Sequence, residues 1–305
     1  MGQGSSSHSA RQGGRSISLE SLSSGIKDGT YKNIVILSGA GISTNAGIPD
    51  FRSPSLGLYF KLKKYNLPYP EAVFEGSYFR KDPLPFYSLV REIYPSRLEP
   101  TLTHKFLSLL SKKKLLRRVF TQNIDGLEGL AGIPSEEIVE AHGSFARSYC
   151  TSCKREYELT WLKREIFAAQ ESNGGVPKCE SCSGIVRPDV VLFGESMPPR
   201  FSQLAESELK KADLLLVIGT SLAVAPFNGL VGLTQSGTPR VYISKTRPGQ
   251  SNSLLGKVLG LNSSIRFEED TDLVLLDDCD AVVLQICRQL GWEKELRDVQ
   301  VEVME

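Results

Sequence analysis

The sequence NIVILSGAGIS, residues 33–43, runs from a short apolar segment directly into a glycine-rich turn. A short, continuous run of branched apolar residues is typical of a strand that is buried on both faces of a parallel sheet. Glycines after such a strand let the backbone approach the pyrophosphate of a dinucleotide, whose charge the next helix N-terminus can offset. Because Thr44 stands where GxGxxG has its third glycine, a plain tight turn stays an alternative interpretation.

Strand and helix patterns alternate outward from this stretch. Further buried strands are predicted at 115–121, 137–141, 213–218 and 240–244, and helices at 84–94 and 102–114. A last helix, capped by Asp277 or Asp278, is predicted to bury one face, made of Val282, Val283, Ile286 and Leu290. The alternation predicts an α/β fold, a Rossmann-like parallel sheet with helices on both faces.

The stretch 143–190 interrupts the alternation, because it is polar and basic and contains four cysteines. They form two CxxC pairs, Cys150 with Cys153 and Cys179 with Cys182, separated by 25 residues. Two such pairs make a tetrahedral sulfur site that suits one structural zinc ion and leaves no position open for water. Two disulfides or a redox CxxC are the alternatives, and Cys279 and Cys287 are read as buried thiols.

These patterns divide the chain into four parts. Residues 1–25, rich in serine and glycine, are expected to form a disordered tail. Residues 26–142 and 191–297 are expected to form the Rossmann-like domain, 143–190 an inserted zinc-ribbon domain, and 298–305 a C-terminal tail. The first six residues, MGQGSS, also fit the loose pattern for N-myristoylation of Gly2.

The composition sets limits on the partners. Lysine plus arginine number 36 and aspartate plus glutamate 35, so the chain has no basic surplus that would favour nucleic acid or a membrane surface. No apolar run approaches the roughly 20 residues that span a bilayer. We therefore expect no direct nucleic-acid binding, and no membrane binding unless Gly2 is myristoylated.

Four short segments carry polar side chains at or near the predicted strand ends: residues 47–52, 121–125, 141–143 and 219–221. Ligands of open α/β sheets bind at the carboxyl ends of the strands. Each segment taken singly has a structural explanation, such as a turn, a cap or a satisfied buried histidine. Their shared position favours a common site.

At this point the chain resembles the sirtuin family of NAD-dependent protein lysine deacylases. The resemblance runs from about residue 30 to 297, and residues 53–75 look most like the sirtuin-2 branch. Its motifs are GAGISTNAGIPDFRS (39–53), TQNIDGL (121–127), HG (142–143), the paired CxxC, RPDVVLFGE (187–195), GTSLAVAPF (219–227) and CDAVVLQICRQLGW (279–292).

The resemblance implies an enzyme that removes acetyl or longer aliphatic acyl groups from lysine side chains and releases nicotinamide and O-acyl-ADP-ribose. His142 is implied as the general base, and Asn123 as a second catalytic residue. The implied NAD contacts are Gly39, Ala40, Gly41, Asp50, Phe51, Arg52, Gln122, Asn123, Ile124, Asp125, Gly219, Thr220, Ser221, Ser244, Lys245 and Cys279. The implied substrate segment, which would pair with the peptide as an added strand, is Val191, Leu192, Phe193, Gly194 and Glu195.

Two positions are informative by comparison with the family. Ser244 stands where the family usually has asparagine, which puts a contact to the adenosine ribose in doubt. Members that remove acidic acyl groups carry a Tyr-x-x-Arg pair, and if Tyr87 aligns with its tyrosine, Val90 replaces the arginine. Neutral acyl groups are therefore expected.

Partners, location and a competing activity follow from the same resemblance. Acyl-lysine proteins are the expected partners, with histones and tubulin-like cytosolic proteins as candidates. A cytoplasmic location is expected, nuclear passage is left open, and a mitochondrial location is not expected. A mono-ADP-ribosyltransferase that uses the same NAD site is the alternative function, and a non-enzymatic zinc-ribbon module is a third.

Overall fold

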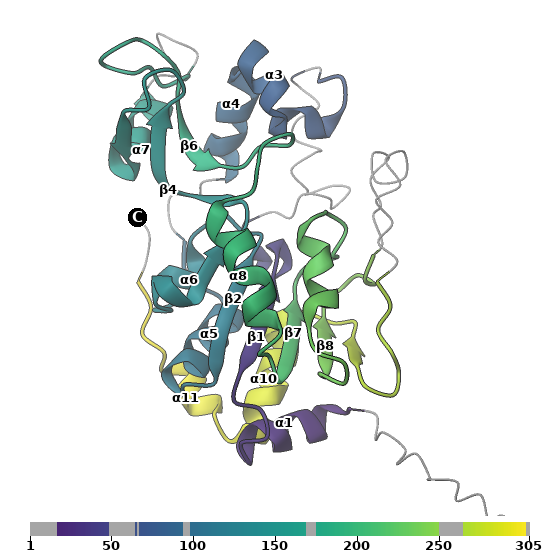
Figure 1. Cartoon of the computed structure of the whole chain (residues 1–305). Coiled ribbons are helices and arrows are strands. Elements are labelled where there is room, and N and C mark those ends of the chain that lie inside the picture. The colour runs from purple at the N-terminus through teal and green to yellow at the C-terminus, as the bar shows by residue number, and fades with distance from the viewer. Residues whose placement is uncertain are drawn as a thin grey trace, which may run out of the picture.

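The computed structural model describes residues 17–48, 65, 67–93, 98–168, 175–249 and 265–302. A six-stranded parallel sheet forms its centre, with the strand order β3-β2-β1-β7-β8-β9 (Figure 1). These strands are β1 (Ile34–Ser38), β2 (Leu116–Thr121), β3 (Ile138–Glu140), β7 (Leu214–Ile218), β8 (Arg240–Ile243) and β9 (Leu273–Leu275). The chain enters the sheet at β1, builds outward to β3, then crosses back to β7, which is the Rossmann order.

Successive side chains of the central strands enter two different cores. Ile34 and Ile36 of β1 pack with the helices of one face, while Val35 and Leu37 pack with those of the other. This is why β1 and β7 read as unbroken apolar runs. The first face is covered by α1 (Leu19–Lys27), α5 (Leu102–Lys112), α10 (Cys279–Leu290) and α11 (Glu293–Arg297), and the second by α8 (Pro199–Leu209) and the 3₁₀ helix η6 (Phe227–Leu233). The predicted fold class is confirmed.

A second, three-stranded antiparallel sheet forms a small module beside the first (Figure 1). It contains β4 (Gly143–Cys150), β5 (Glu156–Glu158) and β6 (Val186–Val190), with α7 (Leu159–Ala168) packed against it. Its core also takes side chains from the 3₁₀ helix η4 (Pro70–Phe74), α3 (Gly76–Lys81) and α4 (Leu84–Ile93). The expected insertion 143–190 holds all three strands and α7, and its hydrophobic core extends to η4, α3 and α4, which precede it in the sequence.

The two predicted tails also differ from the structure. Residues 1–16 lie outside the described residues, but α1 begins at Leu19, capped by Ser18, and buries Leu22 and Ile26 against the sheet-covering helices. At the other end Val299 is buried, and the Glu302 N–H donates to the Leu130 carbonyl at 2.8 Å. The segments 17–25 and 298–302 are therefore parts of the folded domain.

Shorter elements complete the described chain. They are the 3₁₀ helices η1 (Ala40–Ile42), η2 (Thr44–Ala46) and η5 (Ser135–Glu137) and the one-turn helix α6 (Leu127–Leu130). Asp278 caps α10 by accepting hydrogen bonds from the N–H groups of Asp280 and Ala281. Of the two predicted caps, Asp277 and Asp278, the structure selects the second. Within the described ranges, no helix has the length and apolar composition needed to cross a membrane.

Candidate functional site

The carboxyl edge of the large sheet gathers most of the predicted site residues. The 39–41 loop follows β1, Gln122 to Asp125 follow β2, His142 follows β3, and the 219–221 loop follows β7. The strand order reverses between β1 and β7, so a crevice is expected outside their carboxyl ends, where Rossmann-like folds bind dinucleotides. The segment Asp50, Phe51 and Arg52 lies outside the described residues.

The two glycine loops at this reversal pack directly against each other. The Gly41 N–H donates to the Gly219 carbonyl at 2.8 Å. A Cβ atom on Gly41 would lie 2.7 Å from the Gly219 Cα, and one on Gly39 would lie 2.7 Å from the Thr220 Cβ. The chain therefore needs these glycines for the contact between its own loops, in addition to any approach of a ligand. The short turns η1 and η2 follow the first loop, where a helix is expected.

The amides after β2 are held in place by the neighbouring loops. Thr220 Oγ1 donates to Gln122 Oε1 at 2.6 Å, which joins the ends of β2 and β7. Asn123 is buried, and its Nδ2 donates to the Gly39 carbonyl and to Ser43 Oγ, both at 3.2 Å. The Asn123 Oδ1 accepts no hydrogen bond from the described residues, so this oxygen is available to a ligand that binds at this edge of the sheet.

Asp125 is oriented by two donors, Ser43 Oγ at 2.7 Å and the Leu127 N–H at 3.0 Å. Behind it lie the buried Glu128 and His104, which the sequence analysis did not single out. Burial raises the pKa of Glu128, and the Asp125 charge adds to the effect. Only the i, i+3 spacing of Asp125 and Glu128 was visible in the sequence, and nothing local indicated that His104 joins them.

His104, Asp125 and Glu128 offer ligand atoms within 4.8 Å of one another, a spacing that a metal ion could use. His104 Nδ1 contacts Thr101 twice, at 3.2 Å from its N–H and at 2.8 Å from its Oγ1. Because Thr101 Oγ1 also donates to the Ile42 carbonyl at 2.9 Å, these contacts do not assign the ring proton to one nitrogen. His104 Nε2 is buried without a hydrogen-bond partner among the described residues, and burial lowers the pKa of His104 to about 4, which keeps the ring neutral.

The tautomer of His142 is set by a backbone carbonyl. Its Nδ1 lies 3.0 Å from the Gln122 backbone carbonyl, which can only accept, so Nδ1 carries the proton and Nε2 has a free lone pair. Burial lowers the pKa of His142 below its ordinary value of 6.5, although the hydrogen bond to Gln122 opposes this shift. The ring is therefore a neutral base at pH 7, as general-base chemistry needs.

The lowered pKa of His142 predicts the acid side of the pH profile. A base works only when it is unprotonated, so turnover should stay level from pH 8 down to about pH 6.5 and fall tenfold per pH unit below the lowered pKa. Initial rates across pH 5 to 8, with folding checked at each pH, would test this. A fall in rate that begins above pH 7 would contradict the assignment of His142 as the base.

The segment after β6 lies beside His142. The Val191 N–H donates to the His142 carbonyl at 2.9 Å, and the Phe193 N–H donates to the Phe74 carbonyl at 2.7 Å. The Gly194 N–H and carbonyl make no hydrogen bond with the described residues, and the Phe193 side chain is 47% exposed. Backbone groups and an apolar surface are therefore open to an added strand at this place.

The remaining predicted NAD contacts lie farther along the same edge. Ser244 follows β8 and is buried, and its hydroxyl lies 3.5 Å from Thr246 Oγ1. Lys245 forms an ion pair with Asp278 at 2.9 Å, and Cys279 begins α10. The short Ser244 side chain thus turns toward its own loop, which leaves the expected ribose contact without support from this residue.

The four cysteines of the small module come together as predicted. Cys150 Sγ lies 3.5 Å from Cys182 Sγ, and Cys153 Sγ lies 3.6 Å from Cys179 Sγ. Sulfurs around a tetrahedral zinc ion are spaced by about 3.8 Å, since each Zn–S bond is about 2.3 Å. All six cysteines are free in the structure, and the set of four sulfurs fits one structural zinc ion.

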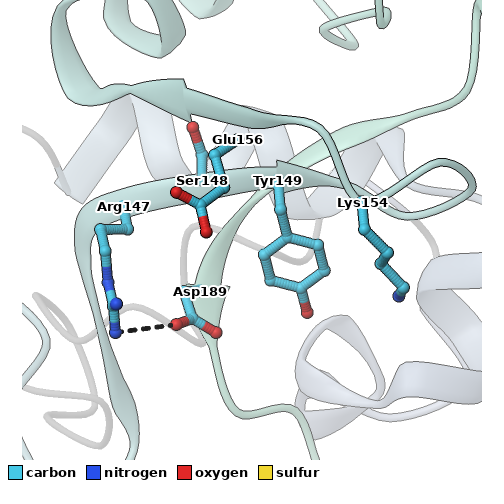
Figure 2. A pocket seen from close by; sticks show the side chains of 6 residues that line it. All are labelled: Arg147, Ser148, Tyr149, Lys154, Glu156 and Asp189. Carbon is cyan, nitrogen blue, oxygen red and sulfur yellow. Dashed lines mark hydrogen bonds and ion pairs between the residues drawn. The ribbon is translucent and has the colours of Figure 1, made fainter.

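An open cavity of about 300 Å³ lies on the small module. Figure 2 shows its lining, in which the Tyr149 ring lies between Asp189 and Lys154. Arg147 and Asp189 form an ion pair at 3.5 Å on its rim. Two cationic side chains and two carboxylates line the cavity, so the lining has no net charge that would favour an anionic or a cationic ligand.

Comparison with known proteins agrees with this geometry. The profile of the Sir2 family matches residues 39–226. The NAD-dependent protein deacetylase sirtuin-2 of Danio rerio is 44% identical over 93% of this chain and 74% of its own length. The NAD-dependent protein deacetylase hst2 of Schizosaccharomyces pombe is also 44% identical, over 94% of this chain and 81% of its own.

A third relative, the NAD-dependent deacetylase sir2A of Dictyostelium discoideum, is 47% identical over 92% of this chain, which spans about half (53%) of that protein. The family profile covers more than half of the chain, and the relatives align with nearly all of it. The predicted resemblance is confirmed: the chain belongs to the Sir2 family, the sirtuins.

Proposed function

We propose that this protein removes acetyl groups from lysine side chains of other proteins and consumes one NAD for each. The single observation that carries the proposal is the state of His142. Its Nδ1–H is held by the Gln122 carbonyl, its Nε2 is free to take a proton, and its own carbonyl holds the 191–195 segment. One residue thus joins the amides after β2 to the proposed peptide site.

The reaction would begin with the departure of nicotinamide from the ribose. The acetyl oxygen of the substrate would attack the ribose carbon as nicotinamide leaves, and the buried amide of Asn123, held by the Gly39 carbonyl, would supply a fixed dipole to the charge that develops there. His142 Nε2 then takes a proton from a ribose hydroxyl, whose oxygen attacks the carbon of the former amide. Addition of water and release of the amine give free lysine and O-acetyl-ADP-ribose.

The zinc ion would be held by Cys150, Cys153, Cys179 and Cys182, and it would supply structure only. Four sulfurs complete its coordination, so no position is left for water or substrate. Its role is to close the small module, whose β4 follows His142 and whose β6 leads into the 191–195 segment.

Mass spectrometry of an acetyl-lysine peptide, with and without NAD, tests the proposal. Loss of acetyl only with NAD, together with nicotinamide and O-acetyl-ADP-ribose, is the expected result. A gain of ADP-ribose on the protein target without loss of acetyl would support the transferase alternative instead. If acetylated and longer-acylated peptides and NAD all remain unchanged after incubation, the result would support the non-enzymatic module instead.

We expect neutral acyl groups to be preferred over acidic ones. Tyr87 and Val90 are both buried in the small-module core, and the Tyr87 hydroxyl donates to the Val186 carbonyl at 2.5 Å. The pair therefore offers no free cation or hydroxyl to an acidic acyl group. Rates on acetyl, hexanoyl and succinyl versions of one peptide would check this, and faster removal of succinyl would contradict it.

Acyl-lysine proteins are the proposed substrate class, with histones and tubulin-like cytosolic proteins as the first candidates to assay. Recognition through the backbone of an added strand favours loose sequence preference. A cytoplasmic location with nuclear passage left open is part of the proposal, and imaging of the tagged full chain would test it. N-myristoylation of Gly2 would be read from the intact mass of the protein made in a eukaryotic host.

A further inference from the structure

A mostly buried ion pair joins the small module to the proposed peptide segment. Arg187 on β6 donates from Nη2 to Glu195 Oε2 at 2.7 Å, and the two side chains are 8% and 30% exposed. The pair links Arg187 within β6 to Glu195, the last residue of the 191–195 segment. Neither residue has a role in the chemistry proposed above.

The guanidinium of Arg187 is fixed from several directions. It donates to the Tyr149 hydroxyl from Nη2 at 2.9 Å and from Nε at 3.2 Å. It also lies 5.6 Å from the ring centres of Phe79 and Tyr149. Tyr149 is opposite Arg187 in the β4–β6 ladder and precedes the zinc ligand Cys150. Contacts from β4 and α3 thus set where the Glu195 carboxylate can lie.

The Glu195 carboxylate in turn closes a tight turn. Its Oε2 accepts the Leu192 N–H at 3.0 Å, while the Glu195 N–H donates to the Leu192 carbonyl, also at 3.0 Å. Gly194 lies within this turn at a φ of 87°, and Phe193 projects from it. The Gly194 backbone groups and the Phe193 side chain are the ones left open to an added strand.

We propose that Arg187 and Glu195 are positioning residues for the acyl-lysine peptide: they hold the 192–195 turn in the shape that an added strand can pair with. This inference rests on the proposed function, because that function assigns the segment to the peptide. A role in stability alone would not predict a selective effect on peptide binding. The pair should affect peptide binding without affecting NAD binding, since the described residues implied for NAD follow strands of the large sheet, whereas the pair lies at the small module.

Substitution of Glu195 separates these effects. Glu195→Ala removes the acceptor for both Leu192 N–H and Arg187, so the Kd and KM of an acetyl-lysine peptide should rise by about tenfold or more, with kcat and the KM for NAD within about twofold. Glu195→Gln keeps an oxygen that can accept, so it should recover most of the affinity. Arg187→Lys, which lacks the planar fork, should weaken peptide binding as Glu195→Ala does.

Arg147→Ala is the matched control, because it breaks an Arg–Asp pair of the same small sheet that is 77% and 48% exposed. Surface pairs of this kind contribute little, so its peptide Kd should equal that of the wild type. Zinc content and melting temperature are measured for every variant, and if Glu195→Ala does not fold, the comparison is made between Glu195→Gln and Arg187→Lys.

The readouts separate this proposal from the proposed function. Peptide affinity is measured by anisotropy of a labelled acetyl-lysine peptide, and turnover is measured apart from it. A wild type that binds the peptide without turning it over would contradict the function and still test the pair. Equal peptide Kd values for the wild type and Glu195→Ala, a parallel rise in the KM for NAD, or no peptide binding by the wild type would overturn the proposal.

Discussion

Replacement of His142 by alanine should lower the rate of deacetylation by at least about 10²-fold, because a positioned general base contributes about 10²–10⁴ in rate. The structure supports a large effect, since the Gln122 carbonyl reserves Nδ1 for the proton and leaves Nε2 as the basic atom. The measurement is the steady-state rate of acetyl loss from one peptide, with NAD saturating, for the wild type and His142→Ala.

The order of the steps supplies an internal control. The base acts after nicotinamide has left, so His142→Ala should still exchange labelled nicotinamide into NAD when acetyl-peptide is present. Zinc content and thermal unfolding should match those of the wild type. Near-normal turnover would remove His142 from the role of base, and loss of both exchange and turnover would place it in NAD or peptide binding instead.

Removal of zinc should unfold the small module and abolish activity. The apparent binding free energy of a structural zinc is roughly 10–16 kcal/mol, and it becomes folding free energy for a module that cannot form the site when unfolded. Cys150→Ala is the sharpest change, because Cys150 is buried in the module core and pairs with Val186 across the β4–β6 ladder. Metal analysis and hydrogen exchange over 143–190 would measure the effect.

Cys287→Ala is the matched control for that experiment. Cys287 is also fully buried, but it lies on α10 in the core of the large domain and outside the sulfur cluster. Its truncation should lower stability by about 1 kcal/mol and leave one zinc per chain. An active wild-type protein that contains no zinc, or a Cys150→Ala variant with normal activity, would contradict the structural role of the metal.

The loss of activity on zinc removal follows from connectivity. His142 immediately precedes β4, and Val191 immediately follows β6, so the two strands of the zinc module bracket the proposed site. Gly143 of β4 pairs with Val190 of β6, so the two strands are joined next to His142 and Val191. Melting the module would therefore release both the proposed base and the proposed peptide segment.

Local pattern determined much of this protein. Residues 34–37 are all apolar because a strand buried on both faces exposes no position to water. The structure places this strand at the centre of the sheet. The CxxC pairs indicated zinc because the chemistry of four thiolates depends on spacing within each pair. The Asp278 cap and the buried face of α10 were likewise encoded within a few residues.

Tertiary structure decided what depends on distant partners. The Gln122 carbonyl determines which nitrogen of His142 is protonated. The Arg187 guanidinium is held in place by the Tyr149 hydroxyl, which comes from another strand. The small module draws part of its core from α3 and α4, which no composition shift marked. Hydrophobic periodicity reports which face of an element is buried, but it carries no information on which distant group that face will meet.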